Sequence, residues 1–284
     1  IVKKVRSWIT RYHINPYNEL EHTGDVRHII TRIGYHTNQI MVCLVVTRKN
    51  VPMLNELVDI LKKIPNMTSI CLNINNERTN RIMGDKVISL YGPGYIEDMI
   101  GDVHFRISPL SFYQVNPIQT EVIYNKAIEF AGLTGKERVI DAYSGIGTIG
   151  MVASDNAGEV ISVELNGDAV RDAVFNAKQN KVKNIRFYKE DAGDFMVKMA
   201  SHKEKADVVF MDPPRSGSDK KFLDSLLRLR PKKVVYISCN PETLARDLKH
   251  LTGNGYRIKE IQPVDMFPST GHVEAVCLLS RREK

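Results

Sequence analysis

The chain has 284 residues with a net charge of +7, from 40 basic and 33 acidic side chains, and 43% of its residues are hydrophobic. A chain of this length and composition can bury a large core in one or two domains, which excludes a disordered or fibrous protein. It has no run of about 18 apolar residues, so we expect no membrane-spanning helix. The mild positive charge is compatible with a phosphate-bearing partner, although a solubilising surface also explains it.

The four cysteines, Cys43, Cys71, Cys239 and Cys277, are too far apart in the sequence for a C-x-x-C metal or redox pair. We therefore predict no metal site and a reducing, cytoplasmic environment. Cys43, Cys71 and Cys277 lie within strand-like apolar runs, so we expect them in the core.

The sequence pattern of residues 1–105 predicts a small α+β domain in which strands and helices follow no regular order. Its first helix is indicated by Val5, Trp8 and Tyr12, which recur at helical spacing. We expect a helix at 1–14, strands at 26–33 and 39–47, a helix at 53–63, a strand at 68–75, and further short strands up to about 105.

The pattern changes after Ser108, and residues 106–284 predict a second domain of the α/β class. Asn116 and Pro117 are an N-cap and a first-turn proline, which predict a helix to about Ala131. Strands then alternate with helices, which predicts a mostly parallel sheet of seven strands with helices on both faces. No helix separates the last two strands, so we expect them to form a hairpin at the sheet edge. The expected strands are 138–142, 159–163, 184–188, 206–211, 232–237, 256–265 and 273–280.

A glycine-rich loop follows the first of these strands, where open α/β sheets bind ligands. Gly145, Gly147 and Gly150 match the G-x-G-x-x-G fingerprint of dinucleotide sites, so an NAD-dependent oxidoreductase is one candidate. Glu164 ends the next strand, where an acidic side chain can accept both ribose hydroxyls. Asp191 follows the third strand, near the expected adenine edge, although it is also placed to cap the next helix.

The loop after the fourth strand of this sheet begins with Asp212, followed by two prolines and Arg215. The prolines predict a rigid, extended turn that holds Asp212 at the top of the sheet, facing the crevice. Arg215 is suited either to a phosphate or to a carboxylate.

Two further strand boundaries carry reactive side chains. Cys239 ends the fifth strand and precedes a helix N-terminus, which favours a nucleophilic thiolate. Glu274 begins a buried strand, so it is either paired or has a raised pKa suited to a general base. His272 is the rival base, or it anchors the loop.

Together these motifs resemble class I S-adenosylmethionine-dependent methyltransferases, and more narrowly the RNA uracil-5-methyltransferase family, whose bacterial members modify tRNA or 23S rRNA. By position, the resemblance implies that Gln114, Tyr143, Glu164 and Asp212 bind the cofactor. We also expect Asp191 to bind the cofactor, because it follows the third strand. The resemblance further implies that Cys239 is the nucleophile that adds to uracil C6 and that Glu274 removes the C5 proton. The motifs are 112–116 (FYQVN), 141–147 (DAYSGIG), 212–215 (DPPR), 238–241 (SCNP) and 271–274 (GHVE).

The resemblance implies an enzyme that uses S-adenosylmethionine to form 5-methyluridine in RNA, with 23S rRNA preferred over tRNA as substrate. A cytoplasmic monomer without a membrane partner is expected. The family's N-terminal TRAM β-barrel and its iron–sulfur cysteines have no counterpart in this sequence, and the chain starts without Met. We therefore expect a fragment that holds no iron–sulfur cluster.

Three alternatives to this hypothesis stay open, and one of them is the NAD-dependent oxidoreductase named above. A class I methyltransferase acting on an exocyclic amino nitrogen also uses an Asp-Pro-Pro loop, but needs no thiolate. An oxidoreductase gives no role to Cys239 with Glu274. A non-catalytic RNA-binding module predicts RNA affinity without methyl transfer.

Overall fold

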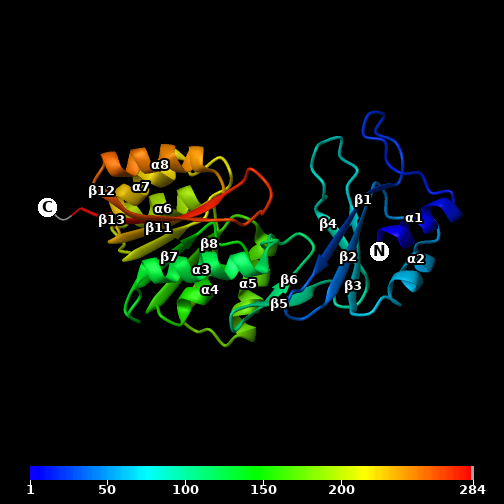
Figure 1. The fold of residues 1–284 in the computed structure, drawn as a ribbon, viewed down its shortest axis with the longest axis horizontal. Helices are drawn as coiled ribbons and strands as arrows, with labels where there is room; N and C mark the ends of the chain where they lie inside the picture. Colours follow the sequence, from blue (N-terminus) through cyan, green and yellow to red (C-terminus); the bar gives the residue numbers. More distant parts are fainter. Residues whose placement is uncertain (283–284) are drawn as a thin grey trace. The chain divides into compact units, whose positions relative to one another are not determined.

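The computed structural model describes residues 1–282, and the chain divides into two compact units (Figure 1). One unit comprises residues 1–99 and 106–110, and the other comprises residues 100–105 and the chain from Ser111 onwards. The domain division at residue 105 stays a prediction, since compactness does not test separate folding. No helix within residues 1–282 has the length and apolar character needed to cross a membrane.

The first unit is built on a four-stranded sheet in the order β1-β2-β3-β4, and β2 and β3 run parallel. Two helices pack on it through a core that includes Val5, Trp8 and Leu57. The first helix ends at Arg11 rather than at residue 14, because His13 turns into the left-handed region with φ 51°. The elements of this segment are α1 (Val2–Arg11), β1 (Val26–Ile33), β2 (Ile40–Val46), α2 (Leu54–Leu61), β3 (Met67–Ile74), β4 (Lys86–Tyr91), β5 (Ile96–Ile100) and β6 (Val103–Ile107).

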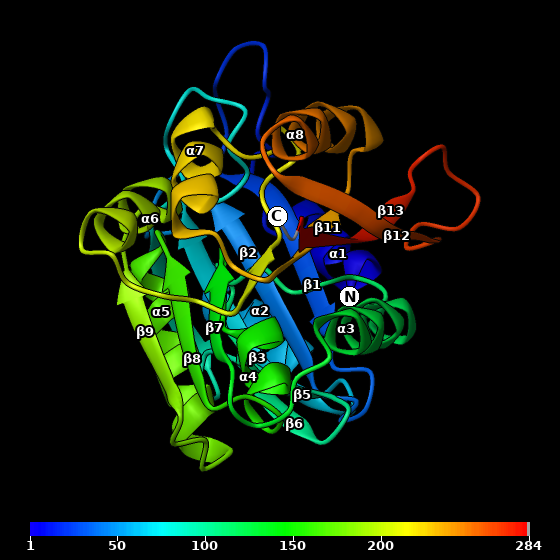
Figure 2. The same ribbon diagram turned by 90° about the vertical axis from the view of Figure 1, so that its left-hand side faces the viewer.

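The second unit contains the predicted seven-stranded sheet, in the order β12-β13-β11-β10-β7-β8-β9. The five strands from β7 to β11 run parallel, and β13 runs antiparallel between β11 and β12. The predicted edge hairpin is therefore confirmed, and Figure 2 shows β12 and β9 at opposite edges. The strands are β7 (Arg138–Ala142), β8 (Glu159–Glu164), β9 (Ile185–Lys189), β10 (Val208–Met211), β11 (Lys233–Ser238), β12 (Tyr256–Val264) and β13 (Glu274–Arg281).

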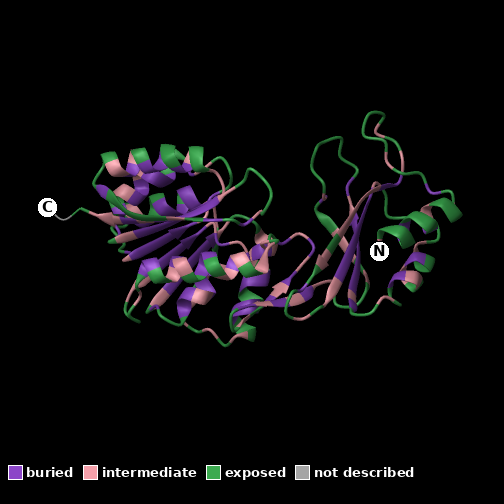
Figure 3. Cartoon of the chain, viewed as in Figure 1, coloured by how far each residue is buried: buried purple, intermediate pink, exposed green. Residues whose placement is uncertain are grey.

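Helices cover both faces of this sheet, as the alternating pattern predicted (Figure 1). The central strands are therefore buried on both sides, which explains their continuous apolar sequences (Figure 3). α3 begins with Asn116 as its N-cap, whose side chain accepts a hydrogen bond from Gln119 N. The helices are α3 (Pro117–Ala131), α4 (Thr148–Ser154), α5 (Gly167–Gln179), α6 (Ala192–Ser201), α7 (Lys220–Leu229) and α8 (Pro241–Gly253).

The carboxyl ends of the parallel strands β7, β8, β10 and β11 point to the same edge of the sheet. β13 enters that edge from the opposite direction, and Ser238 at the end of β11 pairs with Ala275. Glu274 therefore follows beside Cys239, although the two residues are distant in the sequence. The sheet topology thus brings the candidate nucleophile and the candidate base together.

Candidate active site

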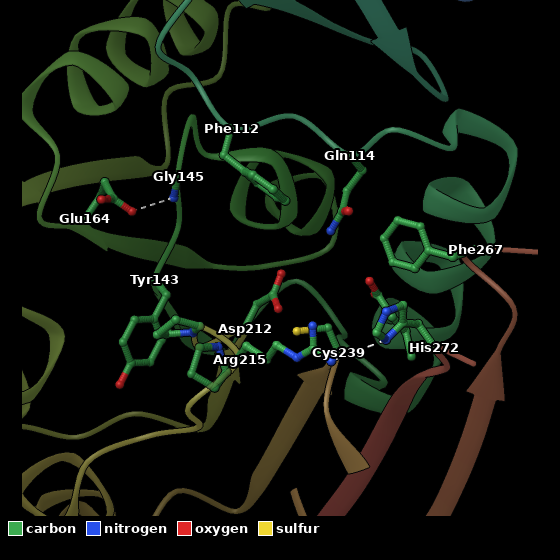
Figure 4. Close-up of a pocket in the computed structure, with 13 residues that line it drawn as sticks. Phe112, Gln114, Tyr143, Gly145, Glu164, Asp212, Arg215, Cys239, Phe267 and His272 are labelled. Carbon is green, nitrogen blue, oxygen red and sulfur yellow. Dashed lines mark hydrogen bonds between the residues drawn. The ribbon is translucent and has the colours of Figure 1, made fainter. Parts of the chain in front are cut away.

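A cavity of about 550 Å³ opens at this edge of the sheet (Figure 4). Six of the seven predicted cofactor-binding and catalytic residues line it: Gln114, Tyr143, Glu164, Asp212, Cys239 and Glu274. They come from the segment before α3, from strand ends and from β13, so only the fold assembles them. The remaining lining residues are Phe112, Gly145, Pro213, Pro214, Arg215, Phe267 and His272.

The glycine-rich loop forms one wall of the cavity. Gly145 and Gly147 have φ values of 56° and 82°, so the tight turn that the sequence predicted is confirmed. Glu164 fixes this wall, since Oε2 accepts a hydrogen bond from Gly145 N at 2.9 Å and Oε1 accepts one from Asn166 N at 2.7 Å. The Glu164 carboxylate is thereby held at the cavity, where a ligand's hydroxyl groups can reach it.

Tyr143 precedes this turn in a strained conformation, with φ 63°. Its hydroxyl group lies 3.2 Å from Ser218 Oγ, and its ring packs against Phe222 with 5.3 Å between centroids. Figure 4 shows the hydroxyl turned away from the centre of the cavity. Tyr143 therefore presents backbone and ring, rather than its hydroxyl group, to a ligand.

The floor of the cavity is acidic. Burial, with Glu274 and Asp141 nearby, raises the pKa of Asp212 to about 8. Burial also raises the pKa of Glu274, whose residue is only 4% exposed. Neither carboxyl group is in an ion pair within the part of the chain that the structure describes. A ligand that brings positive charge would favour the ionised forms of these two carboxyl groups, so the floor suits a cationic ligand.

Cys239 differs from the sequence expectation in its ionisation. Burial and the carboxyl groups of Glu274 and Asp212 raise the pKa of the thiol, so the prediction of a thiolate in the free protein is wrong. The physical reason is the position of the residue. Asn240 is the N-cap of α8 and accepts a hydrogen bond from Glu242 N, so Cys239 lies outside the helix terminus, facing two acids.

The mouth of the cavity carries an arginine and three rings. Arg215 Nη2 lies 3.3 Å from His272 Nδ1, which supports the anchoring role of His272 over that of a base. His272 also meets Phe267 edge-on, with 6.3 Å between ring centroids. Phe112 is 70% exposed at the same cavity, an unusual exposure for a large apolar ring.

Asp191 lies outside the residues that line this cavity. It is the N-cap of α6, where Oδ1 accepts a hydrogen bond from Asp194 N at 3.0 Å. The same oxygen forms an ion pair with Lys221 Nζ at 3.0 Å. Both interactions lower the pKa of Asp191. The capping alternative is thus observed, and the cofactor role of Asp191 stays a prediction.

Sequence reasoning assigned no role to Phe267 or to Ser144. Phe267 lies in the link between β12 and β13, and no spacing in the sequence marks it. Ser144 lines a narrow recess of about 40 Å³ next to the cavity. Its Oγ is buried and has no hydrogen-bond partner within residues 1–282, which makes it an unsatisfied polar atom near the site.

The raised pKa of Asp212 predicts that Asp212→Asn stabilises the protein as pH rises. In the unfolded chain this carboxyl ionises near its ordinary value of 3.8, but in the fold its pKa is about 8. Folding stability is therefore lost between pH 4 and pH 8 in the wild type, and Asp212→Asn removes this loss. Thermal melts should show equal melting temperatures at pH 4 and a higher one for the variant at pH 8, by about 2–4 °C per kcal/mol. Parallel curves would contradict the pKa assignment.

Comparisons with known proteins match both the sequence and the fold. The family model described as tRNA (Uracil-5-)-methyltransferase matches residues 95–282. Proteins named as uncharacterized RNA methyltransferases from Caldanaerobacter subterraneus and Enterococcus faecalis are 48% and 47% identical over 282 and 281 residues, 99% of this chain in each case. This chain spans 62% of the length of each of these relatives.

The structural comparison includes the tRNA (uracil-54, C5)-methyltransferase of Pyrococcus abyssi in complex with S-adenosyl-L-homocysteine. It matches with a TM-score of 0.82 and 31% identity, over 98% of this chain and 65% of that one. The expected class I methyltransferase architecture is thereby confirmed. With a family model that covers most of its length, the chain belongs to the tRNA (uracil-5-)-methyltransferase family.

Proposed function

We propose that this protein methylates C5 of a uridine in RNA, with S-adenosylmethionine as the methyl donor and Cys239 as a covalent nucleophile. The observation that carries the proposal is the convergence of Cys239, Glu274 and Asp212 in one cavity. Methyl transfer to an amino nitrogen needs no thiol beside a buried carboxyl group, because the nitrogen is itself nucleophilic. Membership of the uracil-5-methyltransferase family supports the same reaction.

The cavity fits S-adenosylmethionine in size and in chemistry. A volume of about 550 Å³ lies within the range of small-molecule sites, roughly 300–1,000 Å³. Glu164 would bind the ribose hydroxyls of the cofactor. Gln114, whose amide points into the cavity, would contact the cofactor together with Tyr143 and Asp212 (Figure 4). The acidic floor suits the cationic sulfur. When bound, S-adenosylmethionine supplies a methyl group activated by a positively charged sulfur.

The residues of this chain account for the remaining chemistry. Uracil C5 is a weak nucleophile, so the Cys239 thiolate first adds to C6 and leaves an enolate whose electron pair makes C5 nucleophilic. After C5 has gained the methyl group, Glu274 removes the C5 proton, and the freed electron pair restores the C5–C6 double bond as Cys239 Sγ leaves. Because the pKa of the thiol is raised, adduct formation is expected to accelerate with rising pH.

The RNA substrate is proposed to be 23S rRNA, from the resemblance to bacterial members of the family. A specific observation favours tRNA as the second candidate, since the Pyrococcus abyssi protein, at 31% identity, is named for tRNA. In either RNA the target base must leave its stack to reach the cavity. The exposed Phe112 ring and the partly buried Phe267 ring both line the cavity, and they are suited to stack with an extruded base.

A covalent trap tests the reaction and the substrate together. The protein is mixed with S-adenosylmethionine and either 23S rRNA fragments or tRNA containing 5-fluorouridine, and adducts are detected by denaturing gel and mass spectrometry. Fluorine at C5 replaces the proton that Glu274 would remove, so the complex should stay attached through Cys239. The RNA that gives the adduct identifies the substrate class. Methyl transfer to ordinary RNA without any adduct would refute the thiolate mechanism and favour transfer to an amino nitrogen.

A further inference from the structure

We infer that Asp247 is a positioning residue, which holds the loop carrying Asp212 and Arg215 against the strand and helix that flank Cys239. The inference rests on the proposed function, since it assigns these groups to one reaction. Asp247 lies on α8, does not line the main cavity, and belongs to none of the motifs that identified the site.

Asp247 joins two catalytic elements through one carboxylate oxygen. It is 1% exposed, and its Oδ2 accepts hydrogen bonds from Ser218 N at 2.9 Å and from the Tyr236 hydroxyl group at 2.7 Å. Ser218 belongs to the loop that starts at Asp212, while Tyr236 is on β11, the strand that Cys239 follows. A buried carboxylate with this set of donors is costly to disturb, so it fixes the loop relative to the strand.

The neighbouring Arg246 extends the same attachment. Its Nε donates to Asp247 Oδ1 at 2.8 Å, and its Nη2 donates to Ser216 O at 3.0 Å and to Ser218 O at 3.2 Å. Nearer the start of α8, the side chains of its N-cap Asn240 (Nδ2) and of Thr243 (Oγ1) each donate to Arg215 O at 3.2 Å. The start of α8 therefore holds successive backbone groups of the loop.

Gly217 shows how closely the loop approaches these side chains. A Cβ atom at this position would lie 2.5 Å from Arg246 Nη2 and 2.7 Å from Asp247 Oδ2, and its φ of 76° also favours glycine. The loop backbone thus lies directly on the charged pair. The loop is therefore held against α8 by buried hydrogen bonds and close packing, not by an incidental surface contact.

The attachment controls what surrounds the Cys239 thiol. The charged groups that act on this thiol are Glu274 from β13, Asp212 and Arg215 from the loop, with His272 lining the same cavity. Of these groups, Asp212 and Arg215 lie on the loop that Asp247 holds at Ser218. Ser218 also meets the Tyr143 hydroxyl group, so a displaced loop would disturb the cofactor side of the cavity as well.

Alkylation of Cys239 tests the inference without RNA and therefore independently of the proposed function. We would measure the rate of carbamidomethylation of Cys239 by iodoacetamide from pH 6 to pH 10, by peptide mass spectrometry, in wild type and in Asp247→Asn. Loosening the loop admits water and moves Asp212 away, and these changes outweigh the weaker effect of moving Arg215, so the apparent pKa of the thiol should fall and alkylation near neutral pH should be faster than in wild type. Methyl transfer should fall about 10- to 100-fold in kcat, because a displacement of about 1 Å is enough for that loss.

Asp224→Asn is the matched control, since Asp224 Oδ1 bonds His250 Nε2 at 2.8 Å and joins α7 to α8 away from the loop. It should leave the pH profile of Cys239 unchanged. If Asp247→Asn does not fold, Arg246→Ala is used instead, because Arg246 is a partly exposed side chain that holds the same carbonyls. A folded Asp247→Asn or Arg246→Ala protein with the wild-type pH profile would overturn the inference. If the variant's profile is shifted but the wild-type protein methylates neither RNA, the proposed function is refuted while the positioning role of Asp247 stands.

Discussion

Replacing Cys239 with serine is expected to abolish methyl transfer, with a loss of about 10⁴-fold or more in kcat, of the size seen when an enzyme loses its nucleophile. Serine keeps the shape of the side chain but is a far weaker nucleophile at neutral pH, so C6 of the uracil stays unattacked. The measurement is single-turnover transfer of labelled methyl from S-adenosylmethionine to the RNA that forms the trapped adduct.

Binding separates this chemical effect from misfolding. Cys239→Ser should bind S-adenosylhomocysteine with wild-type affinity by calorimetry, because the thiol's proposed partner is the uracil and not the cofactor. Cys277→Ala is a suitable control, since Cys277 is fully buried in β13 and does not line the cavity. It should form the adduct at the wild-type level. Wild-type turnover by Cys239→Ser would exclude covalent catalysis by this residue.

Glu274→Gln is expected to stop the reaction one step later. The variant can still form the bond between Cys239 and C6 and accept the methyl group at C5, but it lacks the carboxylate that removes the C5 proton. A methylated RNA–protein adduct should therefore accumulate on ordinary uridine, without fluorine. Turnover should fall about 10²- to 10⁴-fold, the typical contribution of a general base. Denaturing gels with labelled S-adenosylmethionine measure both quantities.

His272→Ala distinguishes the two candidate bases. His272 lies at the exposed mouth beside Arg215, whereas Glu274 lies next to the thiol with a pKa raised by burial. We expect His272→Ala to keep turning over and to accumulate no adduct on ordinary uridine. The reverse pattern, with adduct in His272→Ala and turnover in Glu274→Gln, would make His272 the base.

Much of the site was predictable because catalytic residues of α/β proteins follow strand ends, which hydrophobic patterns mark well. Asp212 and Cys239 each end a short apolar run, and Glu274 begins one. The carboxyl ends of parallel strands meet at one edge, so the alternation of strands and helices already implied that these side chains gather there. The glycine-rich turn was equally visible, since positive φ angles select glycine.

The sequence alone thus determined the α/β class of the second unit, its strand ends and the residue types that carry the proposed chemistry, because these depend on local pattern and spacing. Only the tertiary structure decided the environment of each group. Pairing of Ser238 with Ala275 places Glu274 beside Cys239. Burial, together with this carboxyl group, raises the pKa of the thiol, which the position near the helix terminus alone was expected to lower. The hydrogen bond from Ser218 to Asp247 joins residues 29 positions apart. Such contacts depend on packing between distant segments, which no local pattern records.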